Sequence, residues 1–250
     1  SPSICDGLTA TLTATGATSY TWTGGLTGNP ATTLALNANT SYTVTGTTNG
    51  CTGTAVATVT VKPNPIVTVN SPSICNGQTA ILTAGGATTY TWTGGLSGNP
   101  ATTLALSTNT NYTVTGTSNG CIGTAIATVT VKPNPTVTVN SPFICTNQTA
   151  TLTANGATTY TWTGGLVGNP ATTNPLPSTA TFTVTGTTNG CTGTATSTVT
   201  VKPNLTINVN SPNICDGQST TLTASGGTTY TWTGGLPPNA SVSTGVLSST

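Results

Sequence analysis

One phrase recurs four times in the sequence, and its period is the strongest constraint on the fold. It reads ATSYTWTGGLTGNPATT, ATTYTWTGGLSGNPATT and ATTYTWTGGLVGNPATT, and it fades to GTTYTWTGGLPPNAS in the last copy. The tryptophans at its centre follow one another at intervals of 70 residues. They are Trp22, Trp92, Trp162 and Trp232. A fixed period of this kind indicates repeated structural units rather than one large domain, and the 250 residues hold three and a half copies.

Each copy ends at a proline-containing junction. Val61–Pro65 and Val131–Pro135 read VKPNP, and Val201–Leu205 reads VKPNL. Proline fixes φ and removes a backbone donor, so a strand should stop there and a short, stiff, extended connector should begin. The predicted units are 1–65, which lacks an opening strand, 66–135, 136–205, and a partial unit 206–250 without a closing hairpin. Because the connectors are short, we expect these units to stack end to end.

The second copy shows the alternation of β-strands with one buried face. In QTAILTA, Ala80, Leu82 and Ala84 fall on one side of the predicted strand and polar residues with Ile81 on the other. The runs NYTVTGT and TAIATVTV flank SNGC, and Asn-Gly between alternating runs predicts an antiparallel hairpin with a type I′ turn. Helical periodicity is missing and β-branched residues dominate. The predicted fold is all-β, with tandem Ig-like β-sandwich repeats of about 70 residues.

Composition excludes several classes of function. Charged residues are 2% of the chain, histidine is absent and the net charge is +1. This balance offers no basic surface for nucleic acid or for lipid headgroups. No apolar run reaches the ~18 residues of a membrane span, and the chain has neither an initiator Met nor a signal peptide, so we expect it to be processed or excised from a longer chain.

The cysteines follow the same period. The first set is Cys5, Cys75, Cys145 and Cys215, and the second is Cys51, Cys121 and Cys191. A member of the second set follows a member of the first by 46 residues in three copies, which favours disulfides within each unit. The predicted pairs are Cys5 with Cys51, Cys75 with Cys121, and Cys145 with Cys191. Disulfides in small domains are typical of extracellular proteins, and the alternatives are buried thiols in a cytosolic protein or, more weakly, a metal site without the usual His or CxxC ligands.

Cys215 has no equivalent partner position within the chain. Either the sequence is a window on a longer array, or another molecule satisfies this thiol. The first copy also lacks the opening strand and the last lacks the final hairpin, and unpaired sheet edges recruit strands from neighbours. We therefore predict self-association, with head-to-tail strand completion into filaments.

The phrase YTWTGG, followed by NYTVTGTSNGC and a Thr/Val-rich end, resembles the PKD-like and bacterial Ig-like repeats that occur in tandem in large surface proteins. The matching positions are Tyr20, Trp22 and Gly24, Tyr90, Trp92 and Gly94, Tyr160, Trp162 and Gly164, Tyr230, Trp232 and Gly234, with Tyr42, Val44, Tyr112 and Val114 downstream. The resemblance covers the whole chain and implies an Ig-like fold on a bacterial surface. PKD-like repeats usually carry acidic residues beside the Trp-Gly segment, and this chain has Thr and Gly there, so no calcium site is carried over.

The tryptophans have two interpretations. The first is a core role, with each indole packed on a disulfide between two sheets. The second is a row of exposed aromatics that stack on sugars, although alternation places Trp and Tyr together on a single apolar face. Downstream, Tyr42 and Tyr112 could form tyrosine corners, but Phe182 in the third copy has no hydroxyl, so packing is the role that all three share.

Catalysis is not expected, because acid-base chemistry needs titratable groups placed together. Asp6 and Asp216 lie in different copies and histidine is absent. Lys62, Lys132 and Lys202 lack the carboxylate that an internal Lys-Asn crosslink would need, and each should cap a strand edge or a junction. We predict no cofactor and no metal.

The remaining prediction is mechanical: a secreted or cell-surface rod or filament without catalytic activity. The alternative is an adhesin whose repeats bind glycans or surfaces themselves. N-x-S/T triplets add glycosylation as a further hypothesis. They begin at Asn39, Asn111, Asn147, Asn204 and Asn239.

Overall fold

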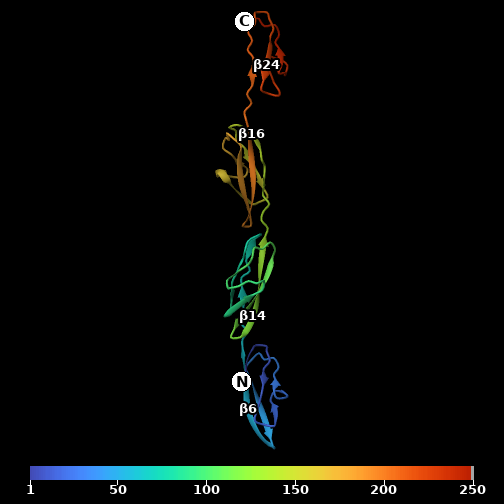
Figure 1. Cartoon of the computed structure of the whole chain (residues 1–250), viewed down its shortest axis with the longest axis vertical. Helices are drawn as coiled ribbons and strands as arrows, with labels where there is room; N and C mark the ends of the chain where they lie inside the picture. Colours follow the sequence, from blue (N-terminus) through green and yellow to red (C-terminus); the bar gives the residue numbers. More distant parts are fainter. Residues whose placement is uncertain (249–250) are drawn as a thin grey trace. The chain divides into compact units, whose positions relative to one another are not determined.

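The computed structural model describes residues 1–248 of the chain (Figure 1). The chain divides into two compact units, Ser1–Asn134 and Pro135–Thr250. The first holds the first two sequence copies, and the second holds the third copy and the partial fourth. The division into four units remains a proposal.

The first unit consists of strands. In the first copy they are β1 (Ser3–Cys5), β2 (Thr11–Leu12), β3 (Ser19–Trp22), β4 (Ala31–Thr32), β5 (Thr40–Thr48) and β6 (Cys51–Lys62). In the second copy they are β7 (Thr68–Val69), β8 (Ser73–Cys75), β9 (Ile81–Leu82), β10 (Ala84–Gly85), β11 (Thr89–Trp92), β12 (Ala101–Thr102), β13 (Thr110–Ser118) and β14 (Cys121–Lys132).

In the second unit, the third copy repeats the strand order of the second copy. The third copy contains β15 (Thr138–Val139), β16 (Phe143–Cys145), β17 (Thr151–Leu152), β18 (Ala154–Asn155), β19 (Thr159–Trp162), the short 3₁₀ helix η1 (Thr163–Gly165), β20 (Ala171–Thr172), β21 (Ala180–Thr188) and β22 (Cys191–Lys202). The partial fourth copy contains β23 (Asn208–Val209), β24 (Thr221–Ser225) and β25 (Ser241–Ser243).

Each of the first three copies is a small β-sandwich. One layer is a four-stranded sheet, with the order β1-β6-β5-β3 in the first copy, and β8-β14-β13-β11 and β16-β22-β21-β19 in the next two. The other layer has the short pairs β2-β4, β9-β12 and β17-β20, and the second and third copies add β7-β10 and β15-β18. The predicted fold of tandem Ig-like β-sandwich repeats is therefore confirmed.

The long hairpin of each sandwich is set by its Asn-Gly turn. Asn119 and Gly120 have φ of 51° and 83°, so both central turn residues lie in the left-handed region, as a type I′ turn requires. Asn49 and Gly50 do the same in the first copy, with φ of 48° and 79°. The turn fixes the register of β13 and β14, which pair from Ser118 opposite Cys121 to Thr110 opposite Val129.

The core is small and lies between the two layers. In the first copy the buried cluster is Ala10, Leu12, Trp22, Ala31, Tyr42, Val44 and Val59. Two of these residues are alanines and the cluster is small, so little apolar area is removed from water. Hydrogen bonds from the repeated phrase help to close the structure.

The repeated phrase bonds to its own sandwich. The indole Nε1 of Trp22 donates to the carbonyl of Gly28, at 3.1 Å. The side-chain amide of Asn29 both accepts from the backbone N–H of Ala14 and donates to its carbonyl. The buried hydroxyl oxygen of Thr33 accepts from the backbone N–H of Ala10, at 2.9 Å. The second and third copies make the same bonds, so retention of GNPATT has a sufficient explanation in the fold.

Candidate functional site

A disulfide joins the first two copies, from Cys5 to Cys121, with a Cα–Cα distance of 5.5 Å. Cys5 ends β1, which runs parallel to the end of β6 and places Cys5 beside Lys62. Cys121 begins β14 of the next copy, directly after the Asn-Gly turn. Its Sγ lies 4.0 Å from the carbonyl oxygen of Lys62. The sulfur bridge therefore fastens the end of one sandwich to the hairpin tip of the next.

The predicted pairing within each unit is wrong. Cys5 is bonded to Cys121, and Cys51 is free. The reason is the length of the hairpin: Cys51 begins the 12-residue strand β6, whereas Cys5 pairs with Lys62 at its other end. At ~3.3 Å per residue that strand spans roughly 36 Å, far beyond the ~7 Å limit between the Cα atoms of a disulfide.

The same geometry overturns the other two predicted pairs. Cys75 pairs with Lys132 at the far end of the strand that Cys121 begins. Cys145 stands opposite Lys202 on the strand that Cys191 begins, and Cys145 is free. Cys75 and Cys191 are disulfide-bonded. The free thiols, all exposed, are Cys51, Cys145 and Cys215.

The junction between the first two copies includes further contacts. The Lys62 ammonium donates to the backbone carbonyl of Asn119 at 3.4 Å, so this lysine holds a junction as predicted. A Cβ added to Gly123 would lie 2.0 Å from the carbonyl oxygen of Pro65. The connector thus lies directly against the hairpin, and any side chain at position 123 would force it to move.

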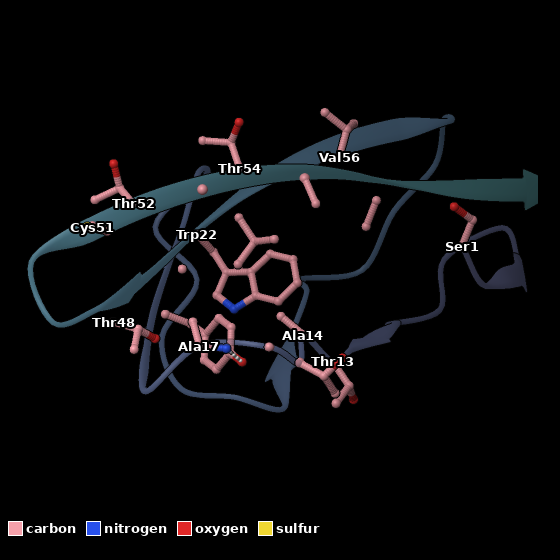
Figure 2. Close-up of a pocket in the computed structure, with 18 residues that line it drawn as sticks. Ser1, Thr13, Ala14, Ala17, Trp22, Thr48, Cys51, Thr52, Thr54 and Val56 are labelled. Carbon is pink, nitrogen blue, oxygen red and sulfur yellow. Dashed lines mark hydrogen bonds between the residues drawn. The ribbon is translucent and has the colours of Figure 1, made fainter.

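The first copy has a groove at the place where, in the second copy, the connector lies against the hairpin (Figure 2). It has a volume of about 580 Å³ and is lined by residues of β3, β5, β6 and the segment 13–17. Figure 2 shows the indole of Trp22 in the groove, with Ala14 and Ala17 on one side and Thr54 and Val56 of β6 on the other. No charged side chain lines it.

The tryptophans take the core position rather than a disulfide contact. Trp22 is 9% exposed and belongs to the buried cluster. Trp92 and Trp162 pack against the corresponding clusters, half-buried. The expected disulfide beneath the indole of Trp22 is a wrong prediction, because Cys5 bonds to the next copy and Cys51 is exposed.

The tyrosine corner also occurs at a different residue. The hydroxyl of Tyr90 accepts from the N–H of Ala87 and donates to its carbonyl, both at 2.8 Å. Tyr20, Tyr160 and Tyr230 accept the equivalent N–H bond. The ring of Tyr112 instead lies against Gly94, where a Cβ would come within 3.0 Å. Phe182 packs in the same way on Gly164, so a hydroxyl is not needed there.

The other sequence candidates show no assembled chemistry. Among residues 1–248, no three His, Cys, Asp or Glu side chains gather as metal ligands would. Asp6 and Asp216 belong to different units. Lys202 lies over the ring of Phe143, 4.8 Å from its centroid. The N-x-S/T asparagines are all exposed: Asn39, Asn111, Asn147, Asn204 and Asn239. Within the described part of the chain, no helix has the length and apolar character to cross a bilayer.

No protein-family model and no curated protein matches the sequence. Among solved structures, the chain is similar to the I-band fragment I67–I69 from titin, with 14% identity, a TM-score of 0.38, and coverage of 80% of this chain and 95% of that one. It is also similar to Drosophila OTK extracellular domains 3–5, with 11% identity, a TM-score of 0.33 and coverage of 80% and 93%. For Sidekick-1 immunoglobulin domains 1–4 the values are 15%, 0.30, 80% and 73%.

Alkylation of the native chain tests the corrected cysteine assignment. We expect iodoacetamide, without reductant, to modify Cys51, Cys145 and Cys215, because these thiols are free and exposed. A non-reducing peptide map should contain one linked pair with Cys5 and Cys121. Recovery of a Cys5–Cys51 peptide by mass spectrometry would contradict the structure.

Proposed function

We propose that this chain is an extracellular, structural, non-catalytic repeat protein that forms a disulfide-stabilised rod or filament on or outside a bacterial cell. The observation that carries the proposal is the bridge from Cys5 in the first copy to Cys121 in the second. A disulfide within a domain supports folding of that domain. A disulfide between copies resists their separation, which is the property that a load-bearing array needs.

The junction supports the same function. The bridge, the Lys62–Asn119 bond and the connector against Gly123 hold the two copies together at three places. Stability in a repeat protein is a sum of the repeats and their interfaces, so a junction of this kind adds to the array each time it recurs. Structural disulfides persist in oxidising compartments, which favours a location outside the cytosol. The resemblance of the sequence to PKD-like repeats supports a bacterial surface.

The competing function is an adhesin whose repeats bind glycans. Aromatic rings that stack on sugars must be exposed, whereas Trp22 is 9% exposed and its indole nitrogen already bonds to Gly28. The repeated phrase is engaged by bonds within the sandwich. Both observations favour the structural function.

Negative-stain microscopy and a glycan array test the proposal together. We expect the purified chain, kept oxidised, to form elongated particles or filaments and to bind no glycan. A matched variant, Cys5→Ser with Cys121→Ser, should give particles with more variable angles between repeats. Compact particles combined with saturable glycan binding would favour the adhesin.

A further inference from the structure

We propose that the open groove of the first copy, together with Cys51, is an acceptor site for the connector of another repeat of this kind. The connector would enter as an extended segment with the pattern Pro-x-Val-x-Val-Asn. The thiol equivalent to Cys5 in that repeat would bond to Cys51. This inference rests on the proposed function, because it treats the chain as part of an array of like repeats.

The second copy shows what occupies this groove. There the segment PNPIVTVN, residues 63–70, lies along the hairpin and forms β7 against β10. A Cβ on Gly123 would meet the carbonyl of Pro65, and one on Gly116 would come within 2.6 Å of Val67 Cγ2. Asn70 closes the segment, since its side-chain oxygen accepts from the N–H of Thr83 at 2.7 Å. Because these glycines have no Cβ, the connector can lie directly against the hairpin.

The third copy repeats the arrangement with its own connector. A Cβ on Gly193 would lie 2.0 Å from the carbonyl of Pro135, and one on Gly186 would lie 2.6 Å from Val137 Cγ2. Asn140 accepts from the N–H of Thr153 at 2.7 Å. In the second and third copies, the connector therefore lies in the groove in the same way, against equivalent glycines.

The groove of the first copy has walls formed by the equivalent residues. Gly53 is the equivalent of Gly123, and a Cβ added there meets no atom within 4 Å. A Cβ added to Gly16 also meets no atom within 4 Å. A Cβ added to Gly86, its equivalent in the second copy, would contact the carbonyl of Ile66. Ala55 on β6 is exposed, whereas Ala125 at the same place in the second copy is half-buried. The groove thus matches an extended backbone with small apolar side chains.

The cysteine beside the groove gives the second, independent observation. Cys51 lines the groove and is free and exposed. Its equivalent Cys121 is 1% exposed and bonded to Cys5, in the copy that also supplies the connector. In the second copy, the connector and the bonded cysteine therefore both come from the first copy. In the first copy, the groove is open and Cys51 is free.

Bond formation at Cys51 needs an oxidant of the disulfide class, such as oxidised glutathione. The Cys51 thiolate attacks one sulfur of glutathione disulfide and releases one glutathione thiol. The incoming thiolate then attacks Cys51 in this mixed disulfide and releases the second glutathione. The two protein thiols lose two protons and two electrons, and the small disulfide is reduced to two thiols.

A tethering experiment on the full chain tests the site. The probe is the peptide CPNPIVTVN, whose cysteine replaces Lys62, because the Lys62 carbonyl lies 4.0 Å from the Cys121 sulfur in the filled junction. In a glutathione redox buffer we expect the peptide to bond to Cys51 at least tenfold more than to Cys145 or Cys215. Those two exposed thiols are internal controls for plain reactivity.

Two matched changes make the result specific. Gly53→Val should fold normally, because its Cβ meets open space, and should reduce the Cys51 adduct to the level of the controls. Thr11→Val, on an exposed position of β2 outside the groove, should leave the adduct unchanged. A peptide CPNPIDTDN, charged at both valine positions, should lose the preference. Equal labelling of all three thiols, or a preference that survives Gly53→Val, would overturn the acceptor site.

The proposed function fails by a different measurement. The rod depends on the junction between Cys5 and Cys121, which the peptide does not touch. If the peptide shows no preference for Cys51 while the Cys5–Cys121 bridge is intact, the acceptor site is excluded and the proposed rod is not affected. If microscopy shows no elongated particles while the peptide still prefers Cys51, the rod is excluded and the acceptor site is not affected.

Discussion

Pulling on the two ends of the chain should give about 40 nm more extension when the Cys5–Cys121 bridge is absent than when it is present. The bridged residues are 116 positions apart. At up to ~3.4 Å per extended residue, that segment has a contour length of roughly 39 nm. An intact disulfide keeps the segment out of the extending path even after both sandwiches unfold, because force crosses the sulfur bond instead.

The measurement is the total contour length in single-molecule force spectroscopy, taken from the first rise in force to detachment. Both samples should carry Cys75→Ser and Cys191→Ser, because those residues are also disulfide-bonded. One sample then adds Cys5→Ser and Cys121→Ser. As a control, Cys51→Ser with Cys145→Ser removes two free thiols and should leave the contour length unchanged. Equal lengths with and without the bridge would show that the two copies are not linked as described.

Gly123→Val should destabilise the second copy by about 2–4 kcal/mol. A Cβ there would lie 2.0 Å from the carbonyl oxygen of Pro65 and 3.3 Å from Val67 Cγ2. The connector must move away, which exposes Val67 and breaks the short ladder between β7 and β10. Val67 is half-buried, so its exposure costs part of the about 1.5–3 kcal/mol of a fully buried valine, and forcing extra atoms into a packed site costs about 1–3 kcal/mol.

The same substitution in the first copy is the matched control. Gly53→Val places its Cβ in open space and lies in a strand, where a β-branched residue is favoured. We expect it to be neutral or to stabilise the first copy by up to about 1 kcal/mol. Hydrogen exchange of residues 66–70 and 84–86, followed through urea unfolding, reports on the affected strands. If both substitutions lowered stability equally, the connector would not lie against Gly123.

Much of the fold was predictable because its signals are local. Alternation in QTAILTA identifies a strand with one buried face, and Asn119-Gly120 identifies the type I′ hairpin, which the structure confirms. These features depend on neighbours in sequence. The fixed 70-residue period then carries each prediction from one copy to the next.

The disulfides were not predictable from spacing. Equal intervals show which cysteines are equivalent, but they do not say which neighbour each one reaches. The length of the hairpin held the missing information, since Cys51 at its turn and Lys62 at its end are separated by nearly the whole of β6. The tyrosine assignment failed for a similar reason, because alternation gives the face of Tyr42 and Tyr90 but not the loop that each hydroxyl can reach.

The groove was partly foreseeable and partly not. The repeat period aligns Gly16 and Gly53 with Gly86 and Gly123 from the sequence alone. The role of these positions is not visible there, because glycine alone does not reveal that a carbonyl oxygen passes close to it in the second and third copies. That close approach appears only when the second and third copies are superposed on the first by their numbering.

The disulfide between Cys5 of one copy and Cys121 of the next has a consequence for how a gene of this kind can change its length. Cys5 of the first copy meets Cys121 of the second, and the cysteines recur with the 70-residue period, so duplication or deletion of a complete period would keep equivalent positions in register at the new boundary. An exchange that removed part of a period would shift the hairpin against the preceding connector and leave thiols stranded in the interior. Recombination can therefore change the length of the molecule in whole steps, with the cross-linking pattern renewed at each step.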